Sequence, residues 1–135
     1  MRFLLDTTVC VDYLRGREPA VQRIRASEPE DLVLSSVVVA ELRYGAEKSA
    51  DPRRNHSLLD TLVRELRCVD FDLSAASAYG RVRASLAARG QLIGPYDMMI
   101  AAHALSLGLI LVTDNLQELR RVEGLQVETW QEPRS

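Results

Sequence analysis

Cysteine is scarce in this chain, which has only Cys10 and Cys68 among its 135 residues. The two lie in different apolar stretches, without a Cys-x-x-Cys pair or a nearby histidine cluster, so the sequence indicates neither a zinc site nor a disulfide framework. We interpret both as small buried thiols.

Long apolar runs are also missing. None approaches the roughly 18 residues that a helix needs to cross a membrane. The acidic residue Asp6 comes too early to leave room for the apolar core of a signal peptide. The sequence therefore predicts a cytoplasmic protein that does not span a membrane.

Lysine is almost absent as well: Lys48 is the only one, and arginine carries nearly all of the positive charge. Arginine binds phosphate groups through paired hydrogen bonds better than lysine does, although an Arg-rich genome would give the same bias. The net charge is −2 and the pI about 5.7, whereas proteins that coat nucleic acid are normally basic overall. Any contact with nucleic acid should therefore be local.

What is present is typical of one globular domain. The chain is 47% hydrophobic and 27% charged, with few glycines and prolines, and its length suffices to bury a core without a disulfide or metal staple. We expect a single domain over residues 1–135.

Short apolar runs alternate with helical patterns along the whole chain. We expect strands at residues 2–5, 31–34, 68–71, 109–112 and 125–129, and helices at 9–14, 20–26, 37–48, 52–66, 74–89, 95–107 and 116–121. This alternation predicts an α/β fold with a central, mostly parallel sheet of about five short strands, flanked by helices on both faces.

Two acidic residues come directly after predicted strands. Asp6 follows the first apolar run, and Asp114 follows the run that ends at Val112 and Thr113. In open α/β sheets, ligands bind at the carboxyl ends of the strands, so the two carboxylates would meet if their strands are neighbours. Asp6 alone could equally be a capping or turn residue before Thr8.

Two further acids lie on predicted helices. Glu41 shares a helical face with Val38 and Leu42, which should pack inward, and a buried carboxylate needs an arginine partner, backbone donors or a metal. Asp97 falls in the first turn of its helix, where the helix dipole favours a carboxylate without any further function.

Taken as a set, these four acids indicate more than four separate structural roles. Carboxylates gathered within a few ångströms repel one another unless they are protonated or neutralised by a cation. Hard oxygen ligands suit Mg²⁺ or Mn²⁺ better than zinc. A metal held in this way can activate water and neutralise the charge of a phosphodiester, so the pattern favours a metal-dependent nuclease.

Four stretches resemble a known family in both order and spacing: LLDT at 4–7, SSVVVAELRYGAEKS at 35–49, GPYDMMIAAHA at 94–104, and VTDNL at 112–116. The chain resembles the PIN-domain nucleases, and specifically the VapC toxins of bacterial toxin–antitoxin pairs.

This resemblance implies a PIN fold, dependence on Mg²⁺ with Mn²⁺ as a substitute, and hydrolysis of RNA that leaves a 5′-phosphate and a 3′-hydroxyl. It puts Asp6, Glu41 and Asp97 on the three usual acidic positions of the family. For the fourth we choose Asp114, where close relatives often carry Asn, and we keep Glu118 as its support or substitute. The expected catalytic acids are Asp6, Glu41, Asp97 and Asp114, and the expected metal ligands are Asp6, Asp97, Asp114 and Glu118.

The resemblance also implies partners. A small VapB-type antitoxin would lay its C-terminal segment across the acidic cleft, and a homodimer or a toxin–antitoxin hetero-oligomer is expected. The stretches 44–49 and 95–97 look most like the toxin subgroup that cuts initiator tRNA in its anticodon loop. Nothing in their spacing reads out a base sequence.

Several residues could contact the substrate. Lys48, Arg53 and Arg54 follow the Glu41 helix, and Arg15 and Arg17 follow the Asp6 helix, although such charges are more often simply solvated.

Three other residues are predicted to have structural roles. We interpret His103 as a core or surface histidine, and Tyr79 and Trp130 as packing or interface residues. The sequence shows no aromatic stripe for stacking RNA bases.

Other functions stay open from the sequence. The protein could be a metal-dependent nuclease that acts on DNA, or a phosphatase-like hydrolase. A phosphatase with an aspartate nucleophile would want a second Asp where Thr8 stands. It could also be a catalytically silent interaction module whose acids are structural.

Overall fold

The structure, a computed structural model, describes residues 1–131 and contains one five-stranded sheet. The strands are β1 (Phe3–Leu5), β2 (Leu32–Ser35), β3 (Arg67–Val69), β4 (Ile110–Val112) and β5 (Val127–Glu128). Their order is β3-β2-β1-β4-β5, and every neighbouring pair is parallel. The predicted sheet is confirmed.

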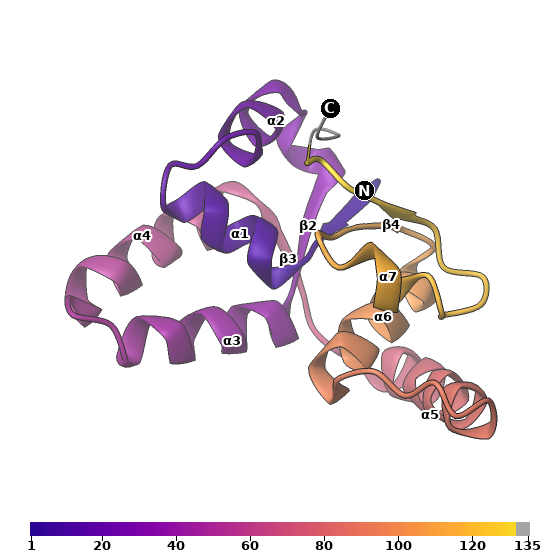
Figure 1. The fold of residues 1–135 in the computed structure, drawn as a ribbon. Coiled ribbons are helices and arrows are strands. Elements are labelled where there is room, and N and C mark those ends of the chain that lie inside the picture. The colour runs from indigo at the N-terminus through magenta and orange to yellow at the C-terminus, as the bar shows by residue number, and fades with distance from the viewer. Residues whose placement is uncertain (132–135) are drawn as a thin grey trace.

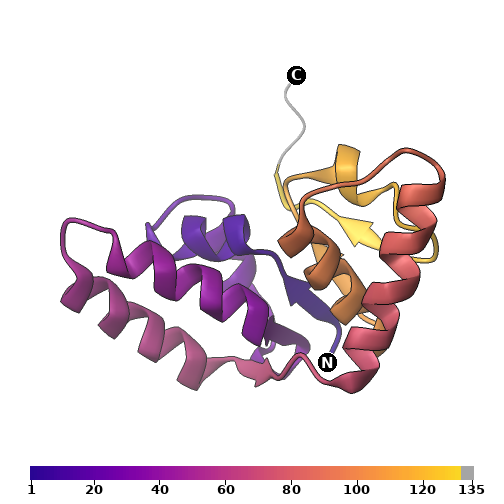
Figure 2. The ribbon, with the colours of Figure 1, turned by 90° about the horizontal axis from the view of Figure 1, so that it is seen from below.

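Helices occupy most of the remaining chain. They are α1 (Thr7–Leu14), α2 (Ala20–Ala26), α3 (Ser36–Glu47), α4 (Pro52–Glu65), α5 (Leu73–Ala88), α6 (Pro95–Leu107) and α7 (Leu116–Leu119), with a 3₁₀ turn at Pro29–Asp31. Figures 1 and 2 show α1, α3 and α4 on one side of the sheet and α5, α6 and α7 on the other. The prediction of helices on both faces is therefore confirmed. Among these residues no helix is long and apolar enough to cross a membrane.

The three central strands, β1, β2 and β4, are short and largely apolar runs, as expected where a parallel sheet is covered on both faces. Leu4, Leu34 and Leu111, one from each of the three central strands, are completely buried. Truncating any of them to alanine should cost about 2–5 kcal/mol of stability. The middle of the sheet is thus a rigid support for the side chains at the carboxyl ends of its strands.

The helix ends near that edge follow simple local rules. The hydroxyl of Ser35 caps α3 by accepting a hydrogen bond from the Val37 amide at 3.1 Å. Pro95 opens α6 directly after Gly94, and Gly108 closes it with φ of +69°. These caps fix the positions of Glu41 and Asp97 on their helices.

Some local predictions were wrong. Asp31 belongs to the 3₁₀ turn, so β2 begins at Leu32, and β5 is only two residues long. Helix α1 starts at Thr7 with Asp6 as its cap, two residues before the predicted start at residue 9. Cys10 is buried as expected, but Cys68 is exposed because it lies on the edge strand β3.

The strand order creates a switch point between β1 and β4. From β1 the chain moves through β2 to β3 in one direction, and it then returns to the other side of β1 to form β4 and β5. Helices before and after this return lie on opposite faces, which opens a crevice at the carboxyl ends of β1 and β4. Asp6 and Asp114 are the acids that follow these two strands.

Candidate active site at the carboxyl edge of the sheet

Asp6 is held rigidly at the end of β1. Its side chain is only 5% exposed. One carboxylate oxygen accepts a hydrogen bond from the Thr7 amide at 2.7 Å, and the other accepts one from the Thr113 hydroxyl at 2.7 Å. Burial raises the pKa of Asp6, and the two hydrogen bonds only partly oppose this. The carboxylate therefore both caps α1 and faces the crevice.

Glu41 is connected to the same end of α1. The Thr7 hydroxyl donates a hydrogen bond to its Oε1 atom at 2.9 Å, and its side chain is half-buried. Among residues 1–131 no arginine or lysine forms an ion pair with Glu41. An arginine partner therefore does not explain this carboxylate within the part of the chain that the structure describes.

Asp97 faces the other acids from the first turn of α6. Its pKa is raised to about 6, first by burial and then by negative charges nearby. Those charges belong to Asp6, Glu41 and Glu118, in decreasing order of effect. A hydrogen bond with Asn115 lowers the pKa in part. The raised pKa shows that the structure brings four carboxylates within electrostatic reach of one another.

Glu118 belongs to this group through Asn115. The Asn115 side-chain amide donates a hydrogen bond to Glu118 at 3.1 Å and also contacts Asp97. Asp114 lies differently, because most of the residue is exposed. Partial desolvation raises the pKa of its carboxyl, a hydrogen bond with Gln131 opposes this, and the nearby charges of Asp12 and Asp6 add to the increase. Glu118 is therefore electrostatically coupled to Asp97, whereas Asp114 lies beside Asp6 toward α1.

The acids are near one another without forming a ready-made metal site. Within residues 1–131, no three His, Cys, Asp or Glu side chains are close enough to hold a metal ion as they stand. The mutual effects on the pKa of Asp97 show that they nevertheless share one crevice. The donor set, carboxylate oxygens with an amide and hydroxyls nearby, has the hard character that fits Mg²⁺ or Mn²⁺. Binding would need side-chain rotation toward the cation.

Two grooves lie next to Glu41 along α3, and both are lined by Thr7, Glu41, Gly45 and Lys48. The predicted contact residue Lys48 thus lines both grooves, seven positions along the chain from Glu41. Arg15 lines the groove between α1, α3 and α4, whereas Arg53 is exposed and lines neither groove.

Several polar residues at the site were missed from the sequence. Thr7 links Glu41 to the start of α1. The Thr113 hydroxyl donates a hydrogen bond to Asp6 and accepts one from the Asn115 backbone amide at 3.0 Å. A threonine after a strand is too common to stand out. Its position directly before or after a candidate acid is the signal that could have found these residues.

His103 is a core residue, as predicted. It is completely buried, and its Nδ1 atom shares a hydrogen bond of 2.8 Å with the Ser35 hydroxyl. Trp130 is also a packing residue, because its ring is buried with an edge against Phe3.

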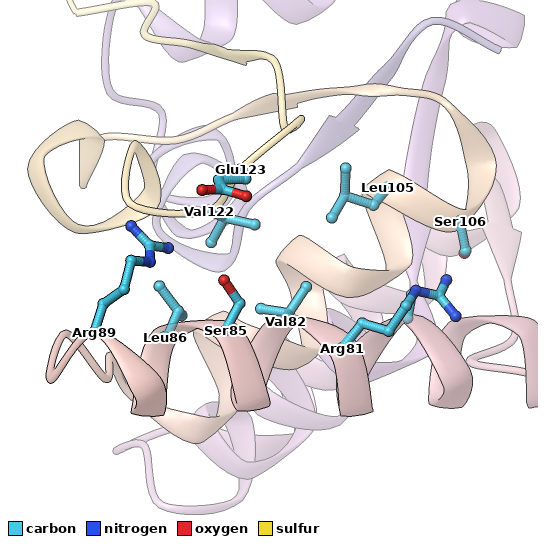
Figure 3. A pocket seen from close by; sticks show the side chains of 10 residues that line it. Arg81, Val82, Ser85, Leu86, Arg89, Leu105, Ser106, Val122 and Glu123 are labelled. Carbon is cyan, nitrogen blue, oxygen red and sulfur yellow. The ribbon is translucent and has the colours of Figure 1, made fainter.

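A separate pocket lies at the opposite end of α6. It has a volume of about 380 Å³ between α5, the end of α6 and Val122. Figure 3 shows Ser85 and Arg89 projecting from α5 toward Glu123, whereas Arg81 projects toward Ser106 at the end of α6. None of the five candidate acids lines it.

The fold and the acidic crevice agree with a sequence-family match. Residues 3–125 match the PIN domain family, whose fold is a nuclease fold. The chain belongs to the PIN-domain family.

Within this family, the chain is similar to VapC proteins over almost its whole length. It is 41% identical to a protein of Shigella flexneri named tRNA(fMet)-specific endonuclease VapC, over 96% of this chain and 98% of that protein. It is 38% identical, with the same coverage, to the protein of that name from Salmonella typhimurium. This similarity puts the chain in the VapC branch of the family.

Solved structures give the same result. The structure of DNA-bound VapBC from Salmonella typhimurium has a chain that matches with a TM-score of 0.91 and 40% identity, over 96% of this chain and 98% of that one. A chain of VapBC2 from Rickettsia felis, bound to a promoter DNA fragment, matches with a TM-score of 0.87 and 32% identity, over 97% and 100%.

Proposed function

We propose that the chain is a Mg²⁺-dependent endoribonuclease, with Mn²⁺ as a substitute, and the toxin of a VapBC toxin–antitoxin system. One observation carries the proposal: Asp6, Glu41, Asp97 and Glu118 face one another at the switch point of the sheet, with the pKa of Asp97 raised to about 6. Carboxylates gathered in a cleft attract a divalent cation, and the bound cation can then neutralise the charge of a phosphodiester substrate. Residues 1–135 would act as one PIN domain.

The acids would divide the work by position. Asp6, Asp97 and Glu118 would hold the metal, with Asp114 as the outer candidate beside Asp6. When bound, the metal supplies activation of water and neutralisation of phosphate charge. Hydrolysis adds water to the phosphorus and breaks its bond to the 3′ oxygen, which leaves a 5′-phosphate and a 3′-hydroxyl.

Glu41 has a different position from the other acids. The Thr7 hydroxyl fixes one of its oxygens, and no hydrogen bond within residues 1–131 involves the other. The free oxygen is available to orient the attacking water and to take up its proton. Thr7 acts as a positioning residue for Glu41.

The substrate would be initiator tRNA, cut in its anticodon loop. Support comes from the Shigella and Salmonella relatives, which are named for tRNA(fMet) and share 41% and 38% of their residues with this chain. Lys48 and Arg15, which line the grooves at Glu41, would contact phosphates close to the cut. Arg53 is exposed on the first turn of α4 and would contact the RNA farther away.

The partner would be a VapB-type antitoxin. The structures from Salmonella and Rickettsia are VapBC complexes, and their chains superpose on nearly all of this one. The antitoxin segment would lie across the acidic crevice, in a homodimer or a toxin–antitoxin hetero-oligomer in the cytoplasm.

Cleavage mapping tests the proposal. The purified chain is incubated with initiator tRNA and with total bacterial RNA, in Mg²⁺, in Mn²⁺ and in EDTA, and the fragment ends are sequenced. We expect discrete metal-dependent cuts in the anticodon loop that Asp6→Asn abolishes. A folded chain, free of antitoxin, that cuts no RNA would overturn the proposal, and cutting of DNA oligonucleotides instead would favour a DNA nuclease.

A further inference from the structure

A groove of about 730 Å³ runs from the acidic crevice along α3. It starts at Thr7 and Glu41, and it ends at Lys48 and at the first turn of α6. This volume is typical of a pocket for an organic ligand. The groove therefore gives the acidic site an extension into which part of a substrate can fit.

Two tyrosines line this groove, and both are unusually exposed. Tyr44 is 66% exposed and Tyr96 is 58% exposed. Each lies close along the chain to an acid of the site: Tyr44 follows Glu41 by one helical turn on α3, and Tyr96 directly precedes Asp97 on α6. Aromatic rings left open to water beside a polar site are favourable stacking surfaces for ligands with flat faces.

The charges along the groove change sign from one end to the other. Glu41 and Lys48 lie seven positions apart on one helix, which corresponds to about 10 Å, or roughly three stacked nucleotides of a nucleic-acid strand. A cation at the acidic end and Lys48 at the far end would both attract phosphates. The spacing suits a strand with phosphates at regular intervals and bases between them.

Lys48 already contacts one of these rings. Its ammonium group lies 5.0 Å from the centre of the Tyr44 ring. Such a contact is weak at an exposed position, so a base can take over the ring face while the ammonium moves to a phosphate. The Tyr44 ring and the Lys48 ammonium would then each exchange a weak, solvated contact for a stronger one with the RNA.

We propose that Tyr44 and Tyr96 form a stacking subsite for unpaired RNA bases next to the scissile phosphate, with Lys48 binding a neighbouring phosphate. The inference rests on the proposed function and adds to it a reason for choosing single-stranded RNA. Unpaired bases can turn outward and stack on aromatic side chains, whereas bases within a duplex cannot. The sequence did not reveal this subsite, because the two tyrosines come from distant stretches.

The groove also suits RNA better than a second copy of the chain. A protein interface needs a core from which charges are depleted, whereas this groove starts at an acid and ends at a lysine. A second copy is nevertheless treated as a competing occupant in the experiment below.

Binding of RNA provides the decisive test. In the Asp6→Asn background, which prevents cleavage, we measure the affinity for a short single-stranded RNA of mixed sequence by fluorescence anisotropy in Mg²⁺. We expect Tyr44→Ala and Tyr96→Ala each to weaken binding about tenfold, and Tyr44→Trp and Tyr96→Phe to restore it to within about threefold. Quenching of a 2-aminopurine base within this RNA should disappear in the alanine variants.

Two further variants separate stacking from damage to the fold. Gly45→Leu adds bulk to the groove at a position where an added Cβ atom would meet no atom within 4 Å, and leucine is the better helix former. We expect this variant to fold and to bind RNA at least about fivefold more weakly. The matched control is Tyr79→Ala on α5, which lies outside the groove and should leave binding unchanged.

The outcomes distinguish this inference from the proposed function. If the parent chain cuts RNA while all tyrosine variants bind and cut as it does, the subsite is wrong and the nuclease stands. If the parent chain cuts no RNA, the proposed function fails first. If sedimentation shows that Tyr44→Ala and Tyr96→Ala break a dimer without changing RNA affinity, the groove is an interface between copies and the subsite is overturned.

Discussion

The two ends of helix α6 carry hollows of opposite character. At its start, Asp97 faces Asp6, Glu41 and Glu118 without a cation from residues 1–131 in ion-pair contact. At its end, a pocket of about 380 Å³ has charges of both signs at its rim (Figure 3). The first arrangement costs free energy and the second does not.

This difference shows which hollow carries information about function. A pocket whose charges are of both signs and solvated has little electrostatic cost, so its existence needs no functional reason. Like charges persist in a crevice only when the surrounding structure holds them there, as Thr7 and Thr113 hold Asp6. The electrostatic cost of bringing like charges together is thus a better guide to the functional site than the presence of an enclosed pocket.

The largest effect should come from Asp6→Asn, with Glu123→Gln at the other end of α6 as its matched control. Asparagine keeps the size of the side chain but removes the charge that a metal needs, so RNA cleavage should fall at least about 100-fold. Glu123→Gln should change cleavage less than twofold. Circular dichroism checks that both variants fold. Equal activities for the two variants would mean that the acidic crevice is not the active site.

A finer comparison sets Glu118→Gln against Asp114→Asn. Glu118 is coupled to Asp97 and bonded to Asn115, so its loss should lower cleavage and metal affinity about 10- to 100-fold. Asp114 is exposed and lies toward Asp12, so we expect a loss of less than about fivefold. Titration of Mn²⁺ by calorimetry gives a second measurement for both variants. The reverse order would make Asp114 the fourth ligand.

The pH dependence of stability should also reveal the acidic end. In EDTA, the pKa of Asp97 is about 6 in the folded chain and roughly 3.9 when unfolded. The folded state thus binds more protons between these values, and its stability falls as pH rises from about 4 to 6. After discounting for solvent exposure, Asp97 should contribute on the order of 1 kcal/mol to this loss.

Urea unfolding in EDTA at several pH values measures this dependence. Asp97→Asn should flatten the profile in this range, whereas Glu123→Gln, remote from the crevice, should not. A parent chain whose stability rises steadily from pH 4 to 6 would show that the acids of the crevice do not repel one another.

The fold could be predicted from the sequence because its central strands are short apolar runs that alternate with helical patterns. Leu4, Leu34 and Leu111 each lie in such a run, and burial on both faces of a parallel sheet requires it. Strand ends were less predictable, since Asp31 joins a 3₁₀ turn instead of β2. Such boundaries depend on tertiary contacts that no local pattern records.

The candidate site was predictable only in part. Asp6, Glu41 and Asp97 stand at positions that strand ends and helix faces define, and the structure brings them together. The choice between Asp114 and Glu118 depends on how the chain turns after β4, and the pattern of residue types does not predict the geometry of that turn. Tyr44 and Tyr96 were missed for a related reason, because only the packing of α3 near α6 unites them.

The smallest effect should come from the pocket at the other end of α6. Arg81→Ala should leave cleavage, metal affinity and RNA binding within about twofold, because exposed arginines contribute little unless a ligand needs them. Arg89→Ala should also leave cleavage unchanged but should cost about 1 kcal/mol of stability. Its guanidinium donates a hydrogen bond of 2.7 Å to the Arg121 carbonyl, which tethers the chain after α7 to α5. Cleavage assays and urea unfolding of both variants separate the two effects. A loss of RNA affinity of more than about fivefold in Arg81→Ala, without a change in stability, would show instead that the RNA reaches around the molecule to this pocket, and the contrast between the two ends of α6 would then no longer hold.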